Sequence, residues 1–198
     1  MPKLILASQS PRRDALLKQI GLDFEVIPSN STEDLLPGAS PRDIAEALAM
    51  EKALSVASGL GDGIVIGADT VVVLEEEILG KPLDEEDARR MLSNLSGREH
   101  QVITGLAVVD AATGRSLGDS VVTDVQFAPL SPELIDRYVA TGEPLDKAGA
   151  YAIQGHGALL VAGISGCYSN VVGLPLRRLA EMLHEFGYDA FKMERQGA

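Results

Sequence analysis

The sequence predicts one α/β domain in which a mixed β-sheet is splayed around a cleft. Strand and helix patterns alternate through the first half of the 198-residue chain, and two long strand-like segments follow in the middle. The sequence shows no linker, no internal repeat and no low-complexity segment. A chain of this length can bury a full core in one domain. We therefore expect a single domain of two lobes over residues 1–191 and a disordered polar tail over 192–198.

Three residues mark the start and the end of the first expected helix. Ser10 is a good helix cap, and Pro11 suits the first helical position because its missing N–H would be unpaired there anyway. Gly21 is a natural residue just beyond the end of that helix. We expect, in order, a strand over 4–7, a helix over 12–20, a strand over 24–27, a loop over 28–40, a helix over 41–58 and a buried strand over 64–66.

The second half is richer in strands. Asp84 and Ser131 are cap residues for two helices, and Thr113-Gly114 marks a turn between two β-type arms. We expect a hairpin over 71–79, a helix over 84–92, strands over 101–109 and 120–127, a helix from 131 to about 142, short strands in the glycine-dense stretch 149–166 and a final helix over 175–186.

Composition and charge exclude several classes of partner. Hydrophobic residues make up 45% and charged residues 23%, as expected of a soluble globular protein. The net charge of −12 argues against a nucleic-acid surface or an anionic membrane, so local cations or a divalent metal would have to meet a polyanionic substrate. Cys167 is the only cysteine, which excludes an intramolecular disulfide and favours a reducing compartment. Because no apolar run reaches signal or membrane-spanning length, we expect a cytoplasmic protein.

Two adjacent arginines open the first expected helix. Arg12 and Arg13 fall in its first turn, where the helix dipole is positive and prefers anions. Free backbone N–H groups, the dipole and two guanidinium groups together form a site for a polyphosphate. The alternative is an ordinary strand–helix junction with two solvated arginines.

Lys52 occupies an unusual position on the second expected helix. With Ile44 at zero and about 100° per residue, Lys52 falls near 80°, inside the apolar stripe that Leu48 and Val56 define. An uncompensated ammonium is unfavourable there. One interpretation is a lysine that extends along the apolar surface to reach water. We favour the other, a lysine that reaches into a polar cleft to hold phosphate oxygens.

Asp69 and Lys81 follow apolar segments and are candidate functional residues. Asp69 comes after three β-branched residues and Gly67-Ala68, so we expect it to project from the C-terminal end of a central strand, where open α/β sheets bind ligands. A carboxylate there can accept a proton from water or hold a divalent cation. The alternative is a turn into the next strand. Lys81 lies between Gly and Pro and could contact phosphate as a point charge, although a solvated turn lysine is commoner.

Several familiar motifs are missing from the sequence. Gly80-Lys81 is followed by Pro82, so it is not a P-loop, and Gly155-His-Gly157 lacks the third glycine of a dinucleotide fingerprint. The three histidines are scattered without metal-ligand spacing, and no Gly-x-Ser-x-Gly elbow occurs. The remaining interpretation is phosphate binding with carboxylate chemistry and no covalent nucleophile.

Seven segments together resemble the Maf-type nucleoside triphosphate pyrophosphatases. In chain order they are 6–13 (LASQSPRR), 51–53 (EKA), 67–72 (GADTVV), 80–82 (GKP), 96–105 (SGREHQVITG), 143–155 (EPLDKAGAYAIQG) and 170–175 (NVVGLP). Each motif alone is weak, but together they span almost the whole chain in the order of the family. The resemblance implies an elongated α/β fold with two lobes around a deep cleft, related to the inosine triphosphate pyrophosphatases.

The resemblance also implies a reaction and a set of residues. The reaction is hydrolysis of a nucleoside triphosphate between the α and β phosphates, with Mg²⁺ or Mn²⁺, to give the monophosphate and pyrophosphate. Asp69 matches the residue usually assigned as proton acceptor, and as a metal ligand it would be joined by Glu33. In family members an acid often precedes this residue, whereas here Thr32 precedes Glu33. The positions that match the phosphate side of the family site are Ser8, Arg12, Arg13, Lys52 and Lys81.

Three positions separate the subgroups of the family. Arg12, Thr70 and Gln154 resemble the branch that acts on dTTP and UTP, whereas the 7-methyl-GTP branch has an aromatic residue, Gln and Glu there. A Gln amide offers a donor and an acceptor, which suits the O4 and N3–H edge of uracil or thymine. The family is also associated with arrest of septum formation, so a cell-division interaction protein is an alternative function. The resemblance further makes a homodimer possible.

Overall fold

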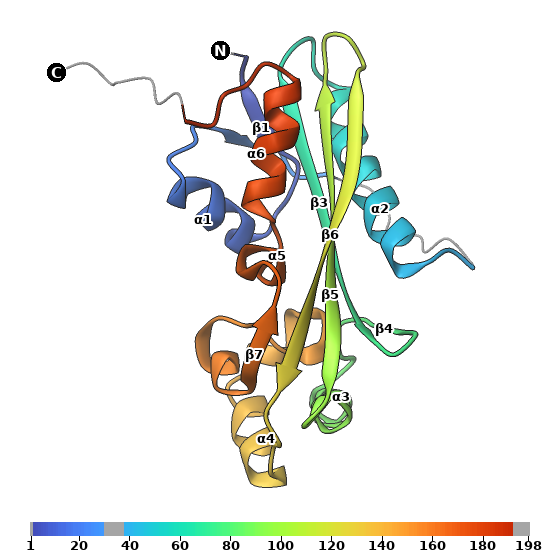
Figure 1. The fold of residues 1–198 in the computed structure, drawn as a ribbon, viewed down its shortest axis with the longest axis vertical. Helices are drawn as coiled ribbons and strands as arrows, with labels where there is room; N and C mark the ends of the chain where they lie inside the picture. Colours follow the sequence, from blue (N-terminus) through green and yellow to red (C-terminus); the bar gives the residue numbers. More distant parts are fainter. Residues whose placement is uncertain (1, 30–37, 192–198) are drawn as a thin grey trace, which may run out of the picture. The chain divides into compact units, whose positions relative to one another are not determined.

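The computed structural model describes residues 2–29 and 38–191, and in them a mixed β-sheet is flanked by helices (Figure 1). Seven strands form this sheet in the described part of the chain, in the order β2-β1-β3-β5-β6-β7, with β4 paired to β3. The predicted α/β class with a mixed sheet is confirmed. By its internal contacts the chain divides into two compact units, here called unit 1 (residues 2–29, 38–69, 104–120 and 173–191) and unit 2 (residues 70–103 and 121–172).

Unit 1 is built around the short central strand β1. The elements of unit 1 are β1 (Leu4–Leu6), α1 (Pro11–Gln19), β2 (Glu25–Val26), α2 (Pro41–Ala57), α6 (Leu176–Glu185) and parts of β3 (Ile64–Leu74), β5 (Glu99–Asp110) and β6 (Ser116–Phe127). Strand β1 pairs in parallel with both β2 and β3. Successive residues of β1 are all buried, as expected of a strand whose two faces are both covered.

Two glycines bring α2 close to the sheet. A Cβ on Gly67 of β3 would lie 2.1 Å from the carbonyl oxygen of Ala49, and one on Gly105 of β5 would lie 2.1 Å from that of Ala45. Both carbonyls belong to α2, whose small residues pack against Ile5 and Val65 in one buried cluster. A larger side chain at either glycine would push the helix off the sheet. This close packing sets the position of Lys52, which α2 also carries.

One sequence expectation about β3 is wrong. Residues 64–74 form one continuous strand, so Asp69 lies inside β3 and does not project from the end of a strand at residue 66. The alternative, a turn at Asp69-Thr70 into the next strand, is wrong as well, because the β-branched run 71–73 continues the same strand. Gly67 instead serves the approach of α2. The hairpin that follows is confirmed, because β4 (Glu77–Leu79) pairs antiparallel with β3.

Unit 2 has its own core between helices and the strand segments that continue from unit 1. Its further elements are α3 (Glu85–Leu95), α4 (Pro132–Val139), the 3₁₀ turns η1 (Glu143–Asp146), η2 (Ala148–Ala150) and η3 (Gly155–Leu159), strand β7 (Val161–Ser165) and α5 (Tyr168–Val172). The predicted caps are confirmed: Asp84 accepts the N–H of Asp87, and Ser131 accepts that of Leu134. Helix α3 runs three residues beyond its predicted end, and α5 was not expected.

An aromatic cluster with a buried histidine lies in the core of unit 2. His100 is 2% exposed and its ring stands edge-on to Phe127 and Tyr151. Its Nε2 lies 2.7 Å from the Tyr151 hydroxyl, while its Nδ1 is buried and finds no hydrogen-bond partner among the described residues. Burial disfavours the charged ring and lowers the pKa of His100 to about 4.

This histidine predicts acid sensitivity of the fold. Between about pH 6.5 and 4 the unfolded chain binds a proton at His100 that the folded chain does not, so the free energy of unfolding falls as the pH falls through this range. The full effect of this one group is about 3 kcal/mol. We expect His100→Gln to show a shallower pH dependence in urea unfolding than the parent chain. Identical pH dependence in both proteins would contradict the assignment.

No helix in residues 2–29 and 38–191 is both long and apolar enough to cross a membrane.

Candidate functional site

The turn from β1 into α1 is organised by Ser8 and Arg13. Ser8 is buried just after β1, and its hydroxyl oxygen accepts the backbone N–H of Ser10 and Nη1 of Arg13, both at 3.2 Å. Nε of Arg13 donates to the carbonyl oxygen of Gly173 at 2.8 Å. Ser10 is the cap residue, as predicted, but its side chain makes no capping bond. Ser8 therefore holds this turn together and fixes the direction of the Arg13 guanidinium.

The first turn of α1 carries both arginines, as predicted. Pro11 occupies the first helical position, and Arg12, which follows it, is half-buried. The same turn also contains Asp14, which forms an ion pair with Lys18 at 2.8 Å. Asp14 is itself favourable near the positive end of the helix dipole, so the dipole alone does not demand a bound anion. The two guanidinium groups remain the stronger argument for one.

Lys52 and Asp69 form the most buried ion pair of unit 1. Nζ of Lys52 lies 2.5 Å from Oδ1 of Asp69, and their side chains are 12% and 11% exposed. Helix α2 supplies the lysine and β3 the aspartate. The pair explains how an ammonium is tolerated in the apolar stripe of α2, because the carboxylate compensates its charge. Lys52 therefore does not simply extend along the helix surface to reach water.

The other predicted site residues fall elsewhere. Thr70 follows Asp69 on β3 and is half-buried, whereas Lys81 and Gln154 are exposed, and all three belong to unit 2. Within unit 2, the N–H of Gly149 donates to the carbonyl oxygen of Gly80, which ties the segment before Gln154 to the residue before Lys81. Glu33 lies outside the described residues. The contacts thus bring together Ser8 with Arg13 and Lys52 with Asp69.

Comparison with known proteins places this chain in a family. The model of a family described as "Maf-like protein" matches residues 3–186. The chain belongs to the Maf family.

Relatives of this Maf chain match it over nearly their full length. A protein of Moorella thermoacetica named dTTP/UTP pyrophosphatase is 54% identical, over 96% of this chain and 98% of its own. A protein of the same name from Pelotomaculum thermopropionicum is 52% identical, over 96% and 99%. Among solved structures, the Ham1 protein of Staphylococcus aureus is 17% identical with a TM-score of 0.44, over 64% of this chain and 72% of that one.

Sequence reasoning missed two groups that hold predicted site residues of this Maf chain in place. These are the carbonyl of Gly173, which binds Arg13, and Gly67, which lets α2 approach β3. A glycine inside an apolar strand pattern is a recognised sign of close backbone approach, so Gly67 could have been found. A carbonyl partner 160 positions away in the sequence leaves no local signal.

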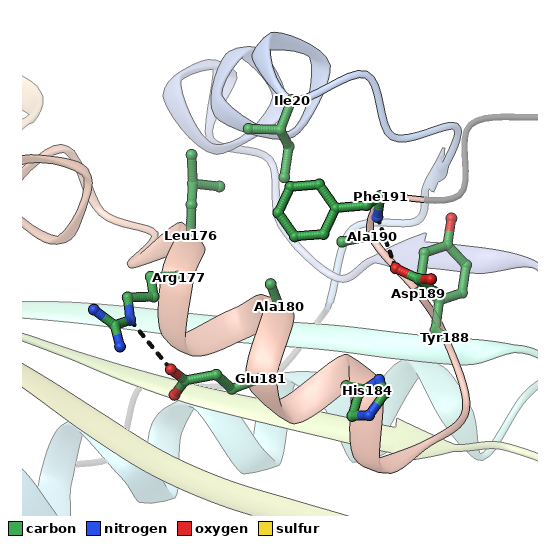
Figure 2. Close-up of a pocket in the computed structure, with 10 residues that line it drawn as sticks. All are labelled: Ile20, Leu176, Arg177, Ala180, Glu181, His184, Tyr188, Asp189, Ala190 and Phe191. Carbon is green, nitrogen blue, oxygen red and sulfur yellow. Dashed lines mark hydrogen bonds and ion pairs between the residues drawn. The ribbon is translucent and has the colours of Figure 1, made fainter.

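The Maf chain also carries an apolar pocket of about 520 Å³ in unit 1, and no predicted site residue is among the described residues that line it. Ile20, Leu176, Ala180 and Phe191 line it, with α6 forming one wall (Figure 2). Arg177, the one arginine among these described lining residues, is paired with Glu181 at 3.2 Å. An apolar lining with a neutralised arginine does not suit a triphosphate.

Replacing Arg13 tests the geometry of the β1–α1 turn. The guanidinium contacts Ser8 and Gly173 through two different nitrogens. Lysine keeps the charge, but its single ammonium nitrogen cannot make both contacts in the same geometry. We expect Arg13→Lys to lower the free energy of unfolding by about 1 kcal/mol. Urea unfolding measures this, with Arg12→Lys as the matched control in the same turn. Equal stability of Arg13→Lys and the parent chain would show that these bonds do not support the turn.

Proposed function

We propose that this chain hydrolyses dTTP and UTP between the α and β phosphates, releasing pyrophosphate and the nucleoside monophosphate. The observation that carries the proposal is the similarity of about 50% over nearly the full length to relatives named dTTP/UTP pyrophosphatase. The buried Lys52–Asp69 pair supports the chemistry, because it offers a carboxylate and a cation side by side. Since the substrate is a free nucleotide, we expect the protein to act in the cytoplasm.

Asp69 is the proposed proton acceptor. In the proposed step a water oxygen bonds to the α-phosphorus, Asp69 takes the water proton, and the bond from the α-phosphorus to the bridging oxygen breaks. Pyrophosphate leaves with the electrons of that bond. Lys52, which donates to Oδ1 of Asp69 at 2.5 Å, is also proposed to stabilise the charge that develops on phosphate oxygens bound beside Asp69.

The remaining predicted residues divide between the phosphates and the base. Ser8, Arg12, Arg13 and Lys81 are proposed to hold phosphate oxygens, for which guanidinium groups are well suited. Thr70 and Gln154 are proposed to recognise the pyrimidine. The amide of Gln154 can donate to O4 and accept from N3–H of uracil or thymine.

A divalent metal, Mg²⁺ or Mn²⁺, fits this site through Asp69. The described residues contain no group of three or more His, Cys, Asp or Glu side chains able to hold an ion. Mg²⁺ in phosphate-processing sites is commonly held by one or two carboxylates together with substrate phosphates. Asp69, together with substrate oxygens, meets that requirement, and Glu33 is the proposed second carboxylate. When bound, the metal would supply positive charge to the triphosphate.

A substrate panel tests the proposal. The purified chain is incubated with dTTP, UTP, CTP, ATP and 7-methyl-GTP, with and without Mg²⁺, and pyrophosphate is measured. We expect metal-dependent release from dTTP and UTP above the others. Preferential turnover of 7-methyl-GTP would overturn the interpretation of Arg12, Thr70 and Gln154, and absence of turnover by the folded protein would overturn the proposed activity.

A further inference from the structure

A half-buried carboxylate organises the loop that carries Gln154. Glu143 begins η1, and its side chain is 19% exposed. Its Oε1 accepts the hydroxyl of Tyr138 at 2.9 Å and the backbone N–H of Gly157 at 3.0 Å. Its Oε2 accepts the backbone N–H of His156 at 3.0 Å. One carboxylate thus satisfies two backbone donors and one hydroxyl, all within unit 2.

Hydrogen bonds of this network hold the backbone on both sides of Gln154 in the sequence. His156 and Gly157 follow it by two and three residues. Tyr138, itself bonded to the carboxylate, accepts the N–H of Ala152 through its hydroxyl at 3.4 Å, two residues before Gln154. Between them, Gly155 has φ +64°, and a Cβ there would lie 2.7 Å from Oε2 of Glu143. The glycine makes room for the carboxylate and permits the turn directly after Gln154.

The charge state of Glu143 suits this role. Burial on its own would raise the pKa of Glu143, but the backbone N–H bonds from Gly157 and His156 and the Tyr138 hydroxyl together lower it. The carboxylate is therefore ionised at neutral pH, and bonds to an ionised acceptor are the stronger kind. Lys147 ties the same turn from its other side by donating to the carbonyl oxygen of Glu143 at 2.6 Å.

We propose that Glu143 is a positioning residue that holds the backbone of Gln154 in place for recognition of uracil or thymine. This inference rests on the proposed dTTP/UTP activity and on the proposed contact of Gln154 with the base. A Gln amide that turns over presents the reversed donor and acceptor pattern, which suits cytosine. Discrimination of UTP from CTP therefore depends on how the Gln154 side chain meets the edge of the base, and the loop sets the backbone position from which that side chain extends. Glu143 supplies that order without contacting the nucleotide.

Glu143→Gln is the sharpest variant for the test. The amide is the same size as the carboxylate, but wherever its NH₂ group points it faces a backbone N–H, either that of Gly157 or that of His156. One of the two bonds is therefore lost. Tyr138→Phe keeps both backbone bonds to the carboxylate and removes the hydroxyl, with its contacts to Glu143 and to the N–H of Ala152. Glu133→Gln, an exposed acid on α4, is the control with the same charge change.

The measurement is the ratio of kcat/KM for UTP to that for CTP, with kcat and KM determined separately. We expect Glu143→Gln and Gln154→Ala each to lower this ratio about tenfold. The change in Glu143→Gln should appear mainly as a higher KM for UTP, while Tyr138→Phe should lie in between and Glu133→Gln should match the parent chain. An unchanged ratio in Glu143→Gln beside a lowered ratio in Gln154→Ala would overturn the proposal.

Amide hydrogen exchange of the folded protein separates this result from the proposed activity. We expect faster exchange at His156 and Gly157 in Glu143→Gln and no change there in Glu133→Gln. Unchanged exchange in Glu143→Gln would overturn the positioning role even if no nucleotide were hydrolysed. Turnover of neither UTP nor dTTP by the parent chain would instead overturn the proposed function, and an unchanged ratio in Gln154→Ala would overturn the base contact that positioning serves.

Discussion

Asp69→Asn is expected to lower the rate of pyrophosphate release from dTTP by about a thousandfold. Asparagine keeps the shape and an oxygen acceptor for Lys52, but it cannot take the proton from water and is a poor metal ligand. The effect should appear in kcat, because the proton moves in the transition state and not on binding. Pyrophosphate release at saturating dTTP and Mg²⁺ measures it.

The control for this variant is Asp62→Asn, which removes an exposed carboxylate in the same unit. We expect it to retain the activity of the parent chain. Thermal unfolding of both variants should be followed in parallel, because Asp69 is also the partner of Lys52. If folded Asp69→Asn kept the parent kcat, Asp69 would not be the proton acceptor.

Gly67→Ala is expected to give a large loss of stability, about 3 kcal/mol. The added methyl group would lie 2.1 Å from the carbonyl oxygen of Ala49 and 2.9 Å from Cβ of Ala53, so α2 has to move away from β3. Both contacts involve the helix itself, which cannot yield as the end of a flexible side chain could. Because α2 carries Lys52 and β3 carries Asp69, the same movement lengthens their 2.5 Å contact.

Urea unfolding and activity together measure this second effect. Gly61→Ala is the matched control, since a Cβ at Gly61 meets no atom of residues 2–29 and 38–191 within 4 Å. We expect its stability to stay within about 0.5 kcal/mol of the parent chain. Similar stability of Gly67→Ala and Gly61→Ala would contradict the close packing of α2 on the sheet.

The order and type of most elements could be predicted from local signals. Asp84 and Ser131 were each expected to start a helix, and each accepts a backbone N–H from the first turn of the helix it caps. The strand β3 shows where local signals fail. A turn at Asp69-Thr70 was one interpretation of the sequence, yet residues 64–74 form one extended strand, and Gly67 allows α2 to approach it closely.

The positions of the candidate site residues could also be predicted only in part from local signals. Arg12 and Arg13 could be placed in a first helical turn from Ser10-Pro11, and Lys52 could be placed in the apolar stripe of α2 from helical periodicity. Helical periodicity could not predict which residue forms an ion pair with Lys52. Nor could it predict that Arg13 would bind the carbonyl of Gly173, because hydrogen bonds between distant segments depend on how the elements pack.

By itself the sequence determined the α/β class, the helix starts and the residue types available for phosphate chemistry, since caps, periodicity and charge act within a few positions of the chain. The ion pair of Lys52 with Asp69 was decided only by tertiary structure, as was the carboxylate of Glu143 beneath the Gln154 loop. In both cases a charged group is wholly or partly withdrawn from water among backbone and side chains from separate elements. Burial makes an unpaired charge unfavourable, so the partner is selected by packing and not by proximity in the sequence.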